Sequence, residues 1–365
     1  MNPKHFLFLL FSFAFCFSQE RTELKKFTLD ANQFYGAIIL HNPDISHLIS
    51  EHPGGVILSY NRKTYGSKTW EELYNYPDLG YSFIYQNTNN ETLGKNYGLY
   101  AHYNFYLFKR NMQLRVGQGI AYVDNPYDKV TNFRNNAYGS DFLSSTYLMF
   151  NYHKENIIAG LGFKAGISII HYSNANFRAP NTSTNTMAFN AGLVYDLDGG
   201  GEIEYIHREK EKVTEPVRYN FALRTGLNES DVINSGQYGF FVLSAYADKR
   251  LGRKSAIQIG ADVYFSNFLK ELIRYQSIAF PENNVSVDDD YKRIGVFVGH
   301  ELFINKMSII SQLGYYVYYP FDFEGRMYNR MGLKRYFGNT IYGAITLKSH
   351  GAKAEAVEFG IGIRL

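Results

Sequence analysis

Segments in which apolar residues alternate with glycine or polar residues recur along the whole chain, and this alternation constrains the fold more than any other feature. The clearest segment covers 156–171, where every second residue is apolar and the residues between include Gly160, Gly162, Gly166 and Lys164. Residues 97–107 and 355–365 alternate in the same way. A period of two places successive side chains on opposite faces of a β-strand. The chain is therefore predicted to be all-β.

The residues on the two faces favour a membrane barrel over a soluble sandwich. The interior of a small barrel is crowded and wet, which suits glycine and an occasional charge, while the apolar outer face contacts lipid. The chain holds 32 Tyr and 29 Phe in 365 residues, enough for aromatic girdles at both membrane interfaces. Past the N-terminus no run of about 18 apolar residues occurs, which excludes a helical membrane protein. We therefore predict an antiparallel transmembrane β-barrel.

Charge and histidine spacing exclude several classes of partner. A net charge of +3 over 365 residues gives no basic footprint for nucleic acid. The ten histidines show no metal-ligand spacing such as His-Glu-x-x-His. We therefore expect no nucleic acid, no metal and no soluble cofactor, and outer-membrane lipid as the surrounding partner.

The N-terminus predicts export. Lys4 precedes an apolar stretch, 6–17, that is too short to span a bilayer and is typical of a signal-peptide core. Cys16 and Ser18 are small residues at the −3 and −1 positions of a cut before Gln19. A signal peptide over residues 1–18 would send the protein to the outer membrane, and its removal would take the only cysteine with it.

Strand counting indicates a duplication. Eight strands can be placed in each half of the chain, and residues 98–102 align with residues 295–299. In both halves the aligned strand precedes a tight turn, and a loop opening on Pro126 or Pro320 follows. Repeats of this kind decide the architecture. We therefore predict a duplicated eight-strand unit, over residues 19–198 and 217–365.

The connection over residues 199–216 bears on how the barrel closes. It has an 18-residue span rich in glycine and charge, longer than a barrel turn needs. Two tandem eight-stranded barrels are therefore favoured, with one sixteen-stranded barrel as the alternative. With both termini periplasmic, the tight turns fall on the periplasmic side and the long connections outside. The long segment 64–78 is the exception, and the sequence offers no explanation for it.

Candidate chemistry lies at the outer end of the seventh strand. His171 and Ser173 share a strand face, and that face is the lipid-facing one, where polar side chains are costly. A histidine can take the serine proton as general base, and the hydroxyl then attacks an ester. Asn174 or nearby backbone N–H groups could hold the oxyanion. On the residues alone His-x-Ser is a weak motif, and ordinary rim residues that start a turn are the alternative.

Residues 163–197, and more loosely the whole first half, resemble the outer-membrane lipid A 3-O-deacylase family, also called acyloxyacyl hydrolases. The resemblance rests on the His-x-Ser-Asn motif and on the Pro-Asn loop that follows it. It implies an eight-stranded barrel that hydrolyses the ester-linked 3-hydroxyacyl chain of lipid A in lipopolysaccharide. It assigns His171 as general base, Ser173 as nucleophile, and Asn174 and Asn181 as oxyanion and substrate contacts.

One residue departs from the family pattern. The family carries a glutamate 14 residues after the histidine, and here that position is Asn185. An asparagine can orient the imidazole through its amide oxygen but cannot stabilise imidazolium with a full charge. Asp141, near the start of the sixth strand, is a candidate substitute. The third catalytic position is therefore expected to be Asn185, with reduced activity or an altered substrate.

The second half offers Lys348, Ser349 and His350, with Glu355, at the equivalent outer end. Lysine replaces the histidine and His350 stands where the serine should be, so this copy is expected to be degenerate, with a repositioned His350–Glu355 pair as the alternative. Two functions follow from the sequence. The first is a carboxylic ester hydrolase acting on lipid A, and the alternative is a non-catalytic structural or transport barrel.

Overall fold

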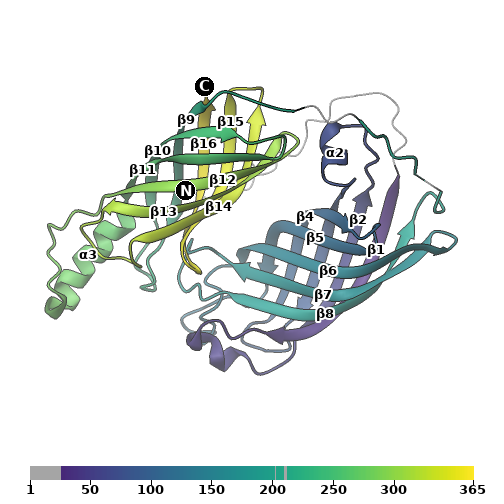
Figure 1. Cartoon of the computed structure of the whole chain (residues 1–365). Helices are drawn as coiled ribbons and strands as arrows, with labels where there is room; N and C mark the ends of the chain where they lie inside the picture. Colours follow the sequence, from purple (N-terminus) through teal and green to yellow (C-terminus); the bar gives the residue numbers. More distant parts are fainter. Residues whose placement is uncertain (1–25, 202, 209–211) are drawn as a thin grey trace.

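The computed structural model describes residues 26–201, 203–208 and 212–365, so the predicted signal peptide lies outside the described residues. Sixteen strands form two closed antiparallel barrels of eight strands each (Figure 1). The first strand of each barrel pairs with the last strand of the same barrel, which closes each unit on itself. The two-barrel prediction is confirmed, and the sixteen-stranded alternative is not favoured. None of the described helices is long and apolar enough to cross a membrane.

The strands of the first barrel are β1 Phe27–Ile38, β2 Gly54–Arg62, β3 Asp78–Asn87, β4 Lys95–Leu107, β5 Met112–Val123, β6 Phe142–Ile158, β7 Leu161–Ser173 and β8 Thr184–Asp196. Those of the second are β9 Arg218–Asn228, β10 Tyr238–Arg250, β11 Ser255–Ser266, β12 Arg293–Ile304, β13 Met307–Tyr318, β14 Met327–Phe337, β15 Ile341–His350 and β16 Lys353–Arg364. The short helices are η2 Pro43–Leu48, α2 Thr69–Leu73, α3 Asn267–Ala279 and η3 Pro281–Asn283.

The turn between β6 and β7 differs from the sequence prediction. The alternation that begins at residue 156 suggested a tight turn at 153–155, but β6 continues to Ile158 and the turn is Ala159–Gly160. Both turn residues have positive φ, 48° and 84°. Apolar residues happen to continue the same parity through the turn, so the period alone could not locate it.

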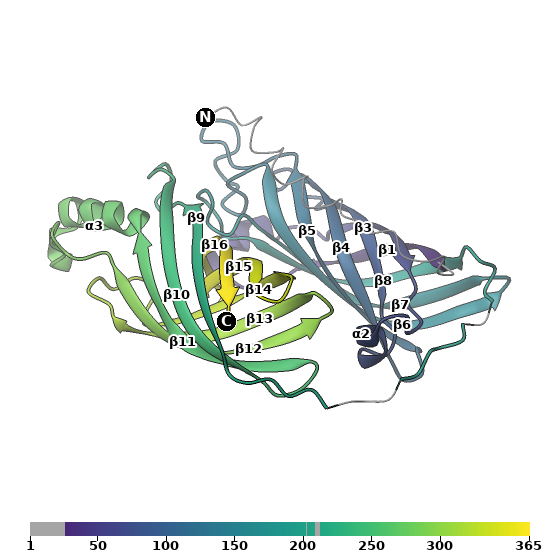
Figure 2. The same ribbon diagram turned by 90° about the horizontal axis from the view of Figure 1, so that it is seen from above.

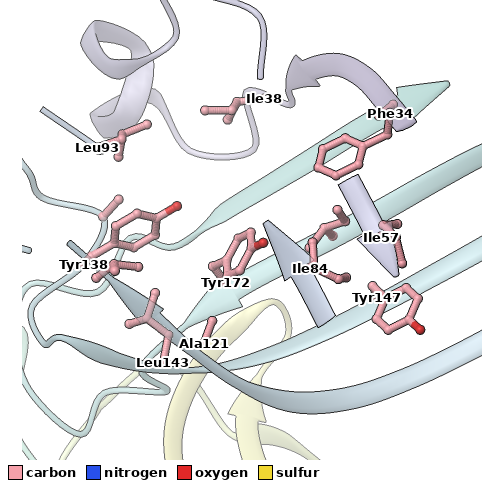
Figure 3. Packing of buried hydrophobic residues seen from close by; sticks show 14 of the residues in the cluster. Phe34, Ile38, Ile57, Ile84, Leu93, Ala121, Tyr138, Leu143, Tyr147 and Tyr172 are labelled. Carbon is pink, nitrogen blue, oxygen red and sulfur yellow. The ribbon is translucent and has the colours of Figure 1, made fainter. Parts of the chain in front are cut away.

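The lumen of the first barrel is filled. At mid-height Arg115 donates to Asp30 at 2.7 Å and Lys164 lies 2.9 Å from the same carboxylate, so the buried charges are paired. Towards the end of the barrel that carries the long loops, an apolar cluster that includes Phe34, Tyr138 and Tyr172 occupies the interior (Figure 3). On the outside, apolar side chains are exposed, as expected for a face that meets lipid.

We call the end with the long connections, including 39–53, 124–141 and 174–183, the loop end, and the opposite end the turn end. The barrels touch at the turn end through α2, where the Tyr74 hydroxyl donates to the Phe303 carbonyl at 2.7 Å. The connection between the barrels also docks there, since the Ile206 N–H donates to the Tyr65 carbonyl at 2.8 Å. Figure 2 shows α2 beside this connection. Segment 64–78, unexplained by sequence, thus bridges the two barrels.

Candidate active site

His171 lies near the loop end of β7 on the outward face of the barrel. It pairs in register with Thr146 of β6 and with Asn185 of β8. Its Nδ1 lies 2.8 Å from Asn185 Oδ1. Because an amide oxygen only accepts, Nδ1 carries the proton and Nε2 is left as the free acceptor. This is the tautomer that a general base needs in order to take a proton through Nε2.

Ser173 lies two residues further along the same face but bonds elsewhere. Its hydroxyl donates to Asn181 Oδ1 at 3.1 Å and accepts from the Ala175 N–H at 2.9 Å. The structure therefore brings Ser173 to Asn181 and places no bond between Ser173 and His171. Residues at i and i+2 of a strand are about 6.6 Å apart, so a side-chain rotation is enough to bring hydroxyl and imidazole together.

Both asparagines predicted to contact substrate hold the loop that follows β7. Asn174 Nδ2 donates to the Arg178 carbonyl at 2.6 Å, and the Asn174 N–H donates to Asn181 Oδ1 at 2.9 Å. Asn181 Nδ2 donates to Asn176 Oδ1 at 3.0 Å. The donors of Asn174 and Asn181 are thus engaged within the loop, which fixes the backbone beside Ser173.

Asp141 is not placed to assist His171. It precedes β6 and is exposed, whereas the residue opposite His171 on that strand is Thr146. Five residues of extended chain separate Asp141 from Thr146, about 16 Å. Asn185, not Asp141, is therefore the hydrogen-bond partner of the imidazole.

The second barrel also contacts this loop, which the sequence did not predict. The Glu229 N–H donates to the Asn176 carbonyl at 2.9 Å, and Glu229 Oε2 accepts from the Ala179 N–H at 3.0 Å. Gln237 Nε2 donates to the Phe177 carbonyl at 2.7 Å. Glu229 itself is 5% exposed, so its own bonds to the loop are shielded from water. The second barrel therefore grips the loop that carries Ser173 and Asn174.

Three further polar side chains lie on the outward face beside the pair, and sequence analysis missed them. Ser144 stands opposite Ser173 on β6, Thr146 stands opposite His171, and Gln118 stands opposite Thr146 on β5. Thr146 Oγ1 donates to Gln118 Oε1 at 2.5 Å, and Gln118 Nε2 donates to Ser144 Oγ at 3.1 Å. In the sequence, each of the three interrupts an otherwise apolar series on the outward face of its strand, and this interruption could have identified them. We call these three residues the polar row.

The motif in the second half does not form an equivalent site. Lys348 and His350 point into the lumen, where Lys348 contacts the Glu355 carboxylate and His350 Nε2 lies 2.7 Å from it. Arg293 donates to the same carboxylate at 2.5 Å. Since a shift of one residue moves a side chain to the other face of a strand, these groups are turned away from lipid. These side chains form a buried charge network, which is what we expect of a degenerate copy that has lost its outward site.

A Ser–His–Asn array also occurs inside the first barrel. Ser82 Oγ lies 2.6 Å from His102 Nδ1, and His102 Nε2 lies 2.7 Å from Asn61 Oδ1. All three side chains are buried in the filled lumen. The array therefore stabilises the interior and faces no substrate. For metals, the described residues contain no group of three His, Cys, Asp or Glu side chains that could hold an ion.

An apolar cleft opens beside His171 and Ser173. It has a volume of about 3020 Å³ and is lined by outward residues of both barrels, including residues of β1, β2 and β3 of the first. The second barrel contributes residues of β9, β10, β14, β15 and β16 to its lining. Figures 1 and 2 both show β14 and β15 on the side of the second barrel that faces the first.

Family models match both barrels. The model of lipid A 3-O-deacylase (PagL) matches residues 54–194, and the model of the acyloxyacyl hydrolase C-terminal domain matches residues 217–365. The chain belongs to the acyloxyacyl hydrolase family. The first match spans His171, Ser173 and Asn185, and the second covers the barrel that carries Glu229. The resemblance deduced from sequence is thereby confirmed.

Membership of the acyloxyacyl hydrolase family supports a lipid A deacylase-like function and an ester hydrolase activity. The family and the barrel fold fit an outer-membrane protein.

Other comparisons add little to the family assignment. No curated protein matches the chain. Among solved structures, two mutants of the Rhodopseudomonas blastica porin are 9% and 8% identical to it, and each alignment covers 94% of this chain and 99% of the porin with a TM-score of 0.18.

Proposed function

We propose that this acyloxyacyl hydrolase family member is an outer-membrane esterase that removes the ester-linked 3-hydroxyacyl chain from lipid A of lipopolysaccharide. The observation that carries the proposal is the 2.8 Å bond between His171 Nδ1 and Asn185 Oδ1 on the outward face. It leaves Nε2 free as a base two residues from the Ser173 hydroxyl. An ester reaching this face comes from the membrane, because beyond the polar residues around His171 the outward side chains of β7 and β8, such as Ile169 and Met187, are apolar and exposed.

The reaction starts when the Ser173 hydroxyl exchanges its bond to Asn181 for one to His171 Nε2. The oxygen then attacks the ester carbonyl carbon while its proton passes to Nε2. The Asn174 amide, which bonds the Arg178 carbonyl in this structure, would exchange that bond for the developing oxyanion. Apo sites often hold catalytic hydrogen bonds that tighten only when substrate is present.

Collapse of the tetrahedral intermediate breaks the bond between the acyl carbon and the sugar oxygen. His171 returns its proton to that oxygen, which leaves as the lipid A hydroxyl. Water then attacks the acyl-Ser173 ester with His171 again as base, and a 3-hydroxy fatty acid is released. Asn185 holds the imidazole throughout but adds no charge to stabilise imidazolium, so its role is orientation.

The alternative of a transport barrel has less support. The Arg115 and Asp30 network and the apolar cluster above it fill the lumen of the first barrel. An eight-stranded barrel is just wide enough for its side chains to fill. The chemistry is therefore assigned to the outer surface of the barrel.

The proposal is tested with the full chain refolded in detergent and supplied with lipopolysaccharide. Release of 3-hydroxy fatty acid is expected from the wild type and is expected to fall by at least about 10³-fold in Ser173→Ala and His171→Ala. Ser168→Ala is the matched control, because Ser168 lies on the same strand but faces the lumen. Equal release from Ser173→Ala and Ser168→Ala would show that Ser173 is not the nucleophile.

A further inference from the structure

We propose that the acyl chains of the lipid substrate lie in the cleft between the two barrels, so that the second barrel forms one wall of the substrate site. This inference rests on the proposed function, since it requires an ester positioned at His171 and Ser173. In this arrangement the second barrel takes part in substrate binding, although that barrel carries no catalytic pair of its own.

The cleft is continuous with the candidate site. Its lining includes His171 and Ser173 together with the polar row, Gln118, Ser144 and Thr146, as defined above. Beyond the polar row the walls become apolar. The first barrel supplies outward residues such as Leu99 and Ile120, and the second supplies Leu347, Val357 and Phe359. Polar groups at one place and hydrocarbon beyond them match a lipid whose ester lies at His171 and whose chains extend from it.

The size of the cleft fits a lipid with several chains. Its volume is about 3020 Å³. Pockets for drug-sized ligands enclose about 300–1,000 Å³. A single small ester would leave most of this space unfilled, whereas several acyl chains and the sugar beside them would occupy it.

Contacts at both ends hold the walls of the cleft in place. At the loop end, Glu229 bonds the backbone of Asn176 and Ala179. At the turn end, Tyr74 bonds the Phe303 carbonyl, and the Lys254 ammonium lies 4.6 Å from the centre of the Tyr74 ring. Two separated attachments limit the relative rotation of the barrels, so the cleft is a built feature of the chain.

The first test fills the cleft from the side of the second barrel. Val357 lines the cleft, and Val298 lies on the outward face of the same barrel, 58% exposed and outside the cleft lining. In the full chain, Val357→Trp is expected to lower deacylation of lipopolysaccharide by at least about tenfold, mainly through a higher KM, because the indole occupies chain-binding space. Val298→Trp is expected to change it less than about twofold. Equal effects of the two substitutions would overturn the proposal.

The second test reads binding without turnover. Full-length Ser173→Ala is mixed with lipid A that carries a photoreactive diazirine at the end of an ester-linked chain, and labelled peptides are mapped by mass spectrometry. We expect labels on β15 and β16 as well as on the first barrel, and a much lower yield with a diazirine-bearing phosphatidylethanolamine. Labels confined to the first barrel, spread evenly around both outward faces, or equal for the two lipids would overturn the proposal.

The two tests separate this inference from the function on which it rests. If the wild type releases no fatty acid but lipid A still labels β15 and β16, the hydrolase assignment fails and the binding site stands. If the wild type is active while Val357→Trp matches Val298→Trp and β15 and β16 stay unlabelled, the hydrolase assignment stands and the proposed binding site in the cleft fails.

Discussion

The bond between His171 and Asn185 leads to the most informative prediction. Asn185→Asp keeps the length and shape of the side chain, so a carboxylate oxygen takes the place of the amide oxygen 2.8 Å from Nδ1. The tautomer of His171 is unchanged, because both side chains accept from Nδ1–H. The substitution therefore adds charge without changing geometry, and Asn185→Leu removes the acceptor at similar volume.

The expected magnitudes follow from the strength of that bond. A neutral hydrogen bond contributes about 0.5–1.5 kcal/mol net, and one to a charged group about 1.5–3 kcal/mol. Imidazolium forms in the transition state, so the carboxylate adds about 1–1.5 kcal/mol, or about 5- to 12-fold in kcat/KM. Loss of the acceptor in Asn185→Leu should cost about 2- to 12-fold.

Steady-state release of 3-hydroxy fatty acid from lipopolysaccharide measures both variants beside the wild type. The order Asn185→Asp above wild type above Asn185→Leu is expected. An unchanged rate in both variants would show that Asn185 does not act through His171, and a faster Asn185→Leu would refute the orienting role outright.

Three further predictions concern the supporting structure. Glu229→Ala, which loses the acceptor for the Ala179 N–H, should lower deacylation about 5- to 10-fold, and Glu229→Gln, which keeps an acceptor oxygen, should retain most of the activity. Equal activity of the two variants would contradict the role of Glu229 in holding the loop. Arg115→Met removes one of the two cations that pair with the buried Asp30 carboxylate and should lower the free energy of unfolding by about 3–5 kcal/mol, measured by urea titration. A loss under about 1 kcal/mol would show that this buried ion pair does not stabilise the barrel. Lys348→Met should leave deacylation by the folded protein within about twofold of the wild type, because the lumen network of the second barrel faces no substrate. A large loss of activity would assign Lys348 a role in turnover.

The strands and their faces could be predicted from sequence because a period of two survives wherever one face meets lipid and the other a crowded lumen. The outward placement of His171 and of Asn185 follows from the same parity, whereas their pairing depends on the register between β7 and β8. The long connection over 199–216 favoured two barrels for a simple geometric reason, since an antiparallel turn needs few residues.

Contacts between segments distant in sequence could not be predicted. Nothing in residues 64–78 shows that Tyr74 bonds Phe303, and nothing near Glu229 points to Ala179. Asn174 was expected to contact the oxyanion, yet the loop uses its backbone N–H and its Nδ2 for bonds of its own. The polar row was readable from parity, but only the registers of β6 with β5 and with β7 place it beside His171.

The direction of the second-half motif follows from the parity of its strand, in which Ile345 and Leu347 stand on the outward face and alternate with Lys348 and His350. Lys348 and His350 have the spacing of His171 and Ser173, but they stand on the opposite parity and face the lumen. Similar spacing at the same end of the barrel therefore gives a buried network in one unit and an outward pair in the other.

The central claim is that the outward pair cleaves an acyl ester of lipid A, and mass spectrometry of lipid A from producing cells tests it most directly. Cells with the wild-type chain are expected to lose the mass of one 3-hydroxyacyl group from lipid A, and cells with His171→Ala are expected to retain it. Unchanged lipid A in both, with both barrels folded in the outer membrane, would contradict the account.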